Sequence, residues 1–215
     1  MNIGFATHPG RKRRHNEDSY VVDPPMFAVA DGMGGAKAGE VASGLAAAAL
    51  KEAGTDGKSG EERVTQLIQE ANRRVFRRAN EDREASGMGT TMTVALVEDG
   101  RVVFGHVGDS RAYLIRKGSI EQLTDDHSLV AELVRSGRLT PEEAEAHPQR
   151  SVITRAVGTE PDVDVDTFTI EPEAGDLFLI CSDGLTDMVD DGTIIDAIER
   201  HRDDLDEAAK ALVGA

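Results

Sequence analysis

The sequence predicts an α+β fold in which antiparallel sheets carry helices on their outer faces. Three observations support this prediction. Two long segments with helical periodicity come early in the chain, a block with a period of two follows, and strands and helices do not alternate regularly. A parallel doubly wound sheet requires that alternation, so the pattern excludes it.

The first 85 residues are predicted to contain short strands and two helices. The segments NIGFATH, SYVV and MFAVAD are typical of strands. Residues 38–53 have helical spacing, and the predicted inner face consists of Val41, Leu45, Ala48 and Ala49. Residues 61–85 form the second predicted helix. We expect its apolar stripe to pack on the core rather than bind a partner; the stripe consists of Val64, Leu67, Ile68, Ala71, Val75 and Phe76.

Residues 90–124 are predicted to form four strands joined by turns. The turns EDGR and RKGS are typical of hairpins, which favours antiparallel pairing. Residues 125–150 are polar with short helical pieces, one of them beginning at Thr140–Pro141, and we expect this insertion to cover a site. The segments SVITRAV, VDTFTI and DLFLICSD are predicted as further strands, followed by helices near 192–201 and 205–213.

The composition is typical of one acidic domain spanning residues 1–215, because the chain shows no linker and no internal repeat. The formal net charge of −16 repels polyanions, which argues against non-specific binding to nucleic acid or to anionic lipid. The sequence contains no membrane-length apolar run and no secretory signal. The single cysteine, Cys181, excludes an internal disulfide. We therefore expect a cytoplasmic protein.

The most informative pattern is an aspartate at the end of three apolar runs. Asp31 ends FAVAD, Asp109 ends VFGHVGD and Asp183 ends LFLICSD. A charge at the end of a buried strand is costly unless it is paired or bound to metal. Three further acids accompany them, namely Glu17, Asp18 and Asp187. Each acid alone could cap a turn or a helix, but the set favours a shared site for Mg²⁺, Mn²⁺ or Ca²⁺.

The glycines that follow Asp31 do not match a nucleotide-binding loop. Lys37 occupies the third glycine position of G-x-G-x-x-G, and Glu40 rather than lysine follows Gly39. Gly32 is instead expected to turn the chain sharply and offer its carbonyl oxygen beside Asp31.

The basic segment RKRR, residues 11–14, precedes the first acids. Alone it is similar to a targeting or nucleic-acid patch, which the net charge argues against. An arginine here could instead face the acidic site and bind phosphate oxygens through paired N–H donors. Acids that hold a cation beside such an arginine indicate hydrolysis of a phosphate ester.

A set of motifs along nearly the whole chain resembles bacterial metal-dependent protein serine/threonine phosphatases of the PPM type, also called type 2C. The motifs are RKRRHNEDS, VADGMGGAKAGEVAS, GTTMTVALV, VGDSRAYLIRKG, LTDDHSL, HPQRSVITRAVG and LFLICSDGLTDMV. The resemblance implies an antiparallel β-sandwich flanked by helices, in four αββα layers. It also implies that residues 125–150 form a flap beside the site.

The resemblance implies two divalent ions, Mn²⁺ or Mg²⁺, and a third ion in bacterial members. Asp31 would bridge the first two, with Glu17 and the Gly32 carbonyl on one ion and Asp183 on the other. The remaining matches are Asp18 in the neighbouring shell, Asp109 and Asp187 on the third ion, and Arg13 on the substrate phosphate.

The chain departs from the family pattern at two places. Met33 stands where some members carry a histidine proposed as general acid. The closing Gly-x-Asp-Asn motif does not occur within residues 1–215, so we expect a C-terminally truncated domain that lacks the last strand and one metal ligand.

The resulting hypothesis is that a water activated by the metal ions hydrolyses phosphoserine and phosphothreonine in proteins. The expected partners are phosphoproteins made by a serine/threonine kinase, and we expect the chain to act as a monomer. Two alternatives remain, a catalytically impaired phosphoprotein-binding module and a phosphatase of small esters. Catalysis by Cys181 is not expected, because an apolar strand surrounds it and predicts a buried thiol.

Overall fold

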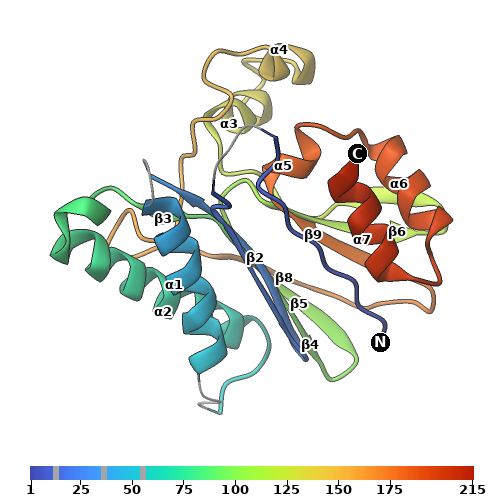
Figure 1. Ribbon diagram of the computed structural model, residues 1–215, viewed down its shortest axis with the longest axis horizontal. Helices are drawn as coiled ribbons and strands as arrows, with labels where there is room; N and C mark the ends of the chain where they lie inside the picture. The colour runs from blue at the N-terminus through green and yellow to red at the C-terminus, as the bar shows by residue number, and fades with distance from the viewer. Residues whose placement is uncertain (12–14, 35–37, 54–56) are drawn as a thin grey trace.

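Two antiparallel sheets form the centre of the structure, a computed structural model that describes residues 1–11, 15–34, 38–53 and 57–215 (Figure 1). The larger sheet has six strands in the order β1-β2-β4-β5-β8, with β3 paired to the end of β2. The smaller sheet has the order β7-β6-β9. The strands are β1 (Asp18–Asp23), β2 (Met26–Met33), β3 (Gly89–Thr90), β4 (Met92–Glu98), β5 (Arg101–Val107), β6 (Arg111–Arg116), β7 (Ser119–Gln122), β8 (Asp166–Ile170) and β9 (Leu177–Cys181).

Helices cover the outer face of each sheet. The six-stranded sheet is covered by α1 (Ala38–Glu52) and α2 (Gly60–Glu81), and the three-stranded sheet by α6 (Asp191–Arg200) and α7 (Leu205–Gly214) (Figure 1). The shorter helices are η1 (Arg83–Ala85), α3 (Leu129–Arg135), α4 (Pro141–Glu145) and α5 (Asp183–Thr186). No described helix is both long and apolar enough to cross a membrane.

Three apolar clusters separate these layers. One lies between α1, α2 and the six-stranded sheet, and another lies under α6 and α7. The third lies between the sheets and contains Phe104, whose ring stacks on Phe168 and tilts against Phe178 at 5.1 and 5.7 Å between centroids. The predicted α+β fold, with antiparallel sheets between helical layers, is therefore confirmed.

Both predicted hairpins are present. The EDGR turn joins β4 to β5, and the RKGS turn joins β6 to β7. Each turn has two residues with positive φ, Asp99 and Gly100 in the first and Lys117 and Gly118 in the second. This conformation matches the right-handed twist of paired strands. Between β5 and β6, by contrast, the chain crosses from one sheet to the other at residues 108–110.

Two predicted strands are not strands in the structure. Residues 2–8, NIGFATH, join neither sheet, and a Cβ on Gly4 would lie only 1.9 Å from the Leu205 carbonyl oxygen of α7. Residues 151–157, SVITRAV, make only isolated bridges, between Ser128 and Ile153 and between Thr90 and Val157. Both segments are apolar because they pack on the molecule, which alternation alone does not distinguish from strand pairing.

The inner face of α1 also differs from the prediction. Val41 is exposed and Leu45 and Ala48 are only half-buried, so of the predicted face Ala49 alone is fully buried. The buried face consists mainly of small residues, namely Ala38, Gly39, Ala42, Ser43, Ala46, Ala47, Ala49 and Leu50. Small side chains let the helix approach β1 and β2 closely, so the largest apolar residues do not identify the buried side.

The segment 125–150 stands apart from the sandwich. It contains α3 and α4 at one end of the molecule (Figure 1). Helix α4 begins with a capping box in which the Thr140 hydroxyl accepts from the Glu143 N–H and the Glu143 carboxylate accepts from the Thr140 N–H. Its predicted role as a flap stays a prediction.

Candidate metal centre

Asp18, the first residue of β1, lies opposite Asp31, two residues before the end of β2. The antiparallel register pairs these two residues directly. Because side chains directly opposite in such a pair are close neighbours, two like charges here would repel unless a cation or donor lies nearby. Both side chains are half-buried.

Glu17 is held against the glycines that follow Asp31. Its carbonyl oxygen accepts hydrogen bonds from the Gly32 N–H at 3.0 Å and from the Ser43 hydroxyl at 2.6 Å. A Cβ on Gly32 would lie 1.9 Å from the Gly39 carbonyl oxygen, so only glycine fits there. The Gly32 carbonyl oxygen and Glu17 Oε1 lie 2.7 and 3.0 Å from the point that a Cβ on Gly39 would occupy. The close contact of the two glycines therefore brings the Gly32 carbonyl oxygen near the Glu17 carboxylate.

Asp109 lies in the segment that crosses between the sheets. It follows Gly108, whose φ of 113° is unfavourable for other residues, and precedes the fully buried Ser110. The Ser110 hydroxyl lies 2.7 Å from the Thr91 hydroxyl. Thr91 in turn bonds the backbone of Asp31, so the ends of β2 and β5 are linked through one residue.

Asp183 follows β9 in the smaller sheet. The hydroxyl of the preceding Ser182 donates to Asp18 Oδ2 at 3.0 Å, which joins the two sheets at this edge. Asp183 is half-buried and begins α5. The N–H of the exposed Asp187 donates to the Asp183 carbonyl oxygen at 2.8 Å.

The electrostatics of Asp109 show that these acids influence one another. Burial, and then the negative charges of Asp183 and Asp126, raise the pKa of Asp109 to about 7. A carboxyl group that is this costly to ionise gains from a neighbouring cation. The strand ends thus bring acids from both sheets to one edge of the sandwich.

The donor set fits a hard divalent cation. All candidate ligands are oxygens, and the close contact of Gly32 and Gly39 places the Gly32 carbonyl near the Glu17 carboxylate. Among the residues that the structure describes, no three acidic, histidine or cysteine side chains are already gathered as a ligand cluster. The Gly32 carbonyl, like the acids, stays a predicted ligand.

Three further residues were singled out by the sequence. Arg13, predicted to bind the phosphate, lies outside the described residues. Cys181 is buried in β9, and burial raises the pKa of its thiol to about 12. This agrees with the predicted inert thiol. The Met33 side chain packs toward Gly89, with its methyl carbon 3.1 Å from where a Cβ on that glycine would lie.

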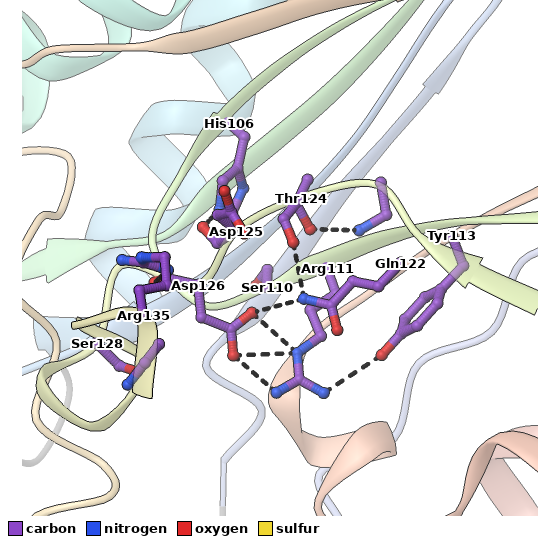
Figure 2. A network of polar contacts seen from close by, with 12 residues as sticks. His106, Ser110, Arg111, Tyr113, Gln122, Thr124, Asp125, Asp126, Ser128 and Arg135 are labelled. Carbon is purple, nitrogen blue, oxygen red and sulfur yellow. Dashed lines mark hydrogen bonds and ion pairs between the residues drawn. The ribbon is translucent and has the colours of Figure 1, made fainter. Parts of the chain in front are cut away.

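Sequence reasoning missed a polar network at the base of the 125–150 segment. Figure 2 shows Asp126 held by Arg111, whose Nε and Nη2 donate to it at 2.9 and 2.7 Å, and by Gln122. The Arg135 guanidinium of α3 donates to the Asp126 carbonyl oxygen at 3.1 Å. Arg111 lies two residues after Asp109, so this network connects the insertion to the acidic edge. The motif LTDDHSL could have indicated this network, because it places two acids, Asp125 and Asp126, directly after a predicted strand.

His127 is the second residue that the sequence reasoning missed. The ring Nδ1 of His127 accepts from the Gly108 N–H at 3.0 Å, while the backbone N–H of His127 donates to the Gly108 carbonyl oxygen at 2.8 Å. Because Nδ1 accepts, Nε2 carries the proton and donates to Asp166 at 3.0 Å. Burial lowers the pKa of His127, which favours this neutral form.

Comparisons with known proteins identify the family. A family model described as "Protein phosphatase 2C" matches residues 11–213. The serine/threonine phosphatase stp of Listeria welshimeri is 41% identical over 224 residues, covering 99% of this chain and 88% of that protein.

Two solved structures extend the match to three dimensions. The Mycobacterium tuberculosis phosphatase PstP/Ppp superposes with a TM-score of 0.88 at 40% identity, over 95% of this chain and 87% of that one. The catalytic domain of PstP in complex with two manganese ions superposes with a TM-score of 0.85 at 38% identity, over 95% and 86%. The predicted resemblance is confirmed: this chain belongs to the protein phosphatase 2C family, alongside bacterial serine/threonine phosphatases.

Proposed function

We propose that this chain hydrolyses phosphoserine and phosphothreonine in proteins with two divalent cations bound at the acidic edge. The observation that carries the proposal is that acids from both sheets lie at one edge of the sandwich. Asp18 and Asp31 come from the larger sheet, Asp109 follows β5 at the crossing, and Asp183 follows the smaller sheet, with Ser182 bonded to Asp18 across the junction. Family membership supports the reaction class.

The cations are proposed to be Mn²⁺ or Mg²⁺, and the two manganese ions in the PstP structure favour the first. Glu17 and the Gly32 carbonyl would hold one ion, Asp183 the other, and Asp31 both. Asp109 with Asp187 would hold a third. When bound, such ions activate a water molecule for attack on phosphorus and stabilise charge on the phosphoryl oxygens.

The chain's own residues orient these ligands. Ser43 and the Gly32 N–H fix the Glu17 backbone, and Ser182 orients the Asp18 carboxylate by donating to one of its oxygens. Arg13 is proposed to bind the substrate phosphate through paired N–H donors. Met33 carries no proton to donate, so we propose that a water molecule protonates the leaving serine or threonine oxygen. The proposed setting is a cytoplasmic monomer acting on phosphoproteins.

The test is phosphate release from a phosphothreonine peptide with and without Mn²⁺, in the wild type and in Asp31→Asn. We expect release to require the metal and to fall at least about 100-fold in the variant, the size of effect seen when a single electrostatic contact at a reacting group is lost. Asp23→Asn is the matched control, because Asp23 lies exposed at the other end of β1.

The outcomes separate the competing functions. Release that survives both chelator and Asp31→Asn contradicts the metal mechanism. Peptide binding without turnover at saturating Mn²⁺ indicates a binding module, and turnover of small esters but not of the peptide indicates a small-ester phosphatase.

A further inference from the structure

One buried threonine contacts both central acid-bearing segments. Thr91 lies between β3 and β4 and is 1% exposed. Its N–H donates to the Asp31 carbonyl oxygen at 2.9 Å, and its Oγ1 accepts from the Asp31 N–H at 2.9 Å. Its hydroxyl also lies 2.7 Å from the Ser110 hydroxyl. The backbone of Asp31 is thus bonded on both sides, and the same side chain reaches the residue after Asp109.

The apolar side of Thr91 contacts the same crossing segment. A Cβ on Gly108 would lie 2.6 Å from both Cβ and Cγ2 of Thr91, so the glycine backbone packs directly on this side chain. A β-branched side chain has few rotamers, and the directions of its hydroxyl and methyl group are coupled. The position of the hydroxyl between Asp31 and Ser110 therefore also sets the contact with Gly108.

A buried threonine whose hydroxyl only bonded groups close by in the sequence would not contact Asp31, Ser110 or Gly108. Its hydroxyl commonly bonds a backbone carbonyl close by in the sequence, as the Thr90 hydroxyl does with the Thr91 carbonyl oxygen at 3.0 Å. Thr91 instead connects the end of β2 to the segment leaving β5, and these are 60 and 19 residues away in the sequence. The hydroxyl acts between two segments that each carry a proposed ligand.

We propose that Thr91 is a positioning residue for the cation site, setting the separation and orientation of Asp31 and Asp109 through its hydroxyl. The proposal rests on the proposed function for the identity of the ligands, but it concerns cation binding rather than turnover. Loss of the hydroxyl removes the acceptor of the Asp31 N–H and the partner of the Ser110 hydroxyl together, so the two ligands are held less firmly before the cation binds.

The test compares Thr91→Val, which keeps the shape and removes the hydroxyl, with Thr91→Ser, which keeps the hydroxyl. Calorimetric titration of the chelator-treated chain of residues 1–215 with Mn²⁺ measures affinity. We expect Thr91→Val to weaken Mn²⁺ binding about 10- to 100-fold, as losses of supporting contacts to ligands do, and Thr91→Ser to restore it to within about threefold. Amide hydrogen exchange at Asp31 should accelerate in the valine variant alone.

Thr124→Val is the matched control. Thr124 is also buried, and its hydroxyl accepts from the Ala112 N–H at 3.1 Å without touching a proposed ligand. This variant should lose a buried hydrogen bond and keep Mn²⁺ affinity. Equal weakening in both valine variants means that only general stability changed, which overturns the proposal.

Further outcomes keep the two proposals distinct. Wild-type Mn²⁺ affinity and Asp31 exchange in Thr91→Val overturn the positioning role and leave the phosphatase proposal intact. Mn²⁺ binding without phosphate release contradicts the phosphatase proposal and leaves the positioning role testable. If Thr91→Val does not fold, Ser110→Ala removes the other end of the 2.7 Å contact and should weaken Mn²⁺ binding; unchanged affinity there overturns the proposal.

Discussion

The two sheets support the site to different degrees. In the six-stranded sheet, β4 and β5 are buried along most of their length and are covered by α2. In the three-stranded sheet, β6 is buried, but β7 is largely exposed and β9 is half-buried up to Cys181. The acidic edge of the sandwich is therefore formed by one deeply buried sheet and one more exposed sheet.

The difference extends to the acids. The backbones of Glu17 and Asp31 accept or donate several hydrogen bonds within the larger sheet and α1. Asp183 lies on the shallower side, at the start of a helix of four residues. We infer that ligand geometry is established mainly by the larger sheet and that Asp183 adjusts to it.

The largest expected effect comes from matched truncations in the two sheets. Phe104→Ala removes a fully buried ring of β5, whereas Phe178→Ala removes a half-buried ring of β9 in the same cluster. We expect the first to lower the free energy of unfolding by about 3–5 kcal/mol and the second by at least about 1 kcal/mol less. Urea denaturation of both variants checks this, and equal losses would remove the distinction between the sheets.

The second prediction adds a methyl group to one glycine in the larger sheet and to one glycine next to the smaller sheet. A Cβ on Gly105 in β5 would lie 2.2 Å from Cγ1 of Val64 in α2, whereas a Cβ on Gly184 after β9 would have its nearest neighbour, Ser182 Oγ, at 3.7 Å. Gly105→Ala should therefore destabilise the fold by about 3 kcal/mol, at the upper end of overpacking effects. Gly184→Ala should leave thermal unfolding nearly unchanged, and a large shift there would show that the smaller sheet is packed as tightly.

The third prediction is acid sensitivity that originates on the larger sheet. Burial, and then repulsion from His127 when both rings are protonated, lower the pKa of His106 to about 4, against an ordinary value of 6.5. His106 faces the Thr93 hydroxyl, the Asp125 carbonyl oxygen and, 4.8 Å away between ring centroids, His127, with the charges of Asp126 and Asp166 nearby.

The sign follows from proton binding. Between pH 6.5 and 4 the unfolded chain binds a proton that the folded one excludes, so stability present above pH 6.5 is lost as the pH falls. His106 alone should account for a loss of about 2 kcal/mol between pH 7 and pH 5. Denaturant titrations at both values measure it, and His106→Gln should flatten the dependence. An unchanged slope in that variant would assign the acid sensitivity to other groups.

The smallest expected effect compares the two hairpin turns. Lys117 adopts a φ of 53° in the smaller sheet, where the turn type favours asparagine, while Asp99 occupies the same place in the larger sheet with a φ of 51°. Lys117→Asn should stabilise the fold by about 0.5 kcal/mol, because the exposed ion pair to Glu173 that it loses contributes little. Asp99→Asn should change almost nothing. Differential scanning calorimetry distinguishes the two, and a loss of stability in Lys117→Asn would show that the ion pair matters more.

Local sequence patterns predicted much of the molecule. Alternation and Gly-containing turns predicted the strands from β4 to β7, and the apolar runs before Asp31, Asp109 and Asp183 predicted acids that lie within two residues of a strand end. Both depend on residues adjacent in the chain, where periodicity and turn conformation are decided. The family resemblance then supplied the expected four-layer arrangement.

The tertiary structure decided the rest. It determined that the chain crosses between sheets after β5, that small residues form the buried face of α1, and that residues 2–8 pack beside α7 instead of pairing as a strand. It also brought Thr91 between Asp31 and Ser110. Hydrogen bonds and close packing act between atoms a few ångströms apart, whatever their distance in sequence. The sequence by itself therefore determined which residues are acids at strand ends, and only the folded chain determined what holds them together.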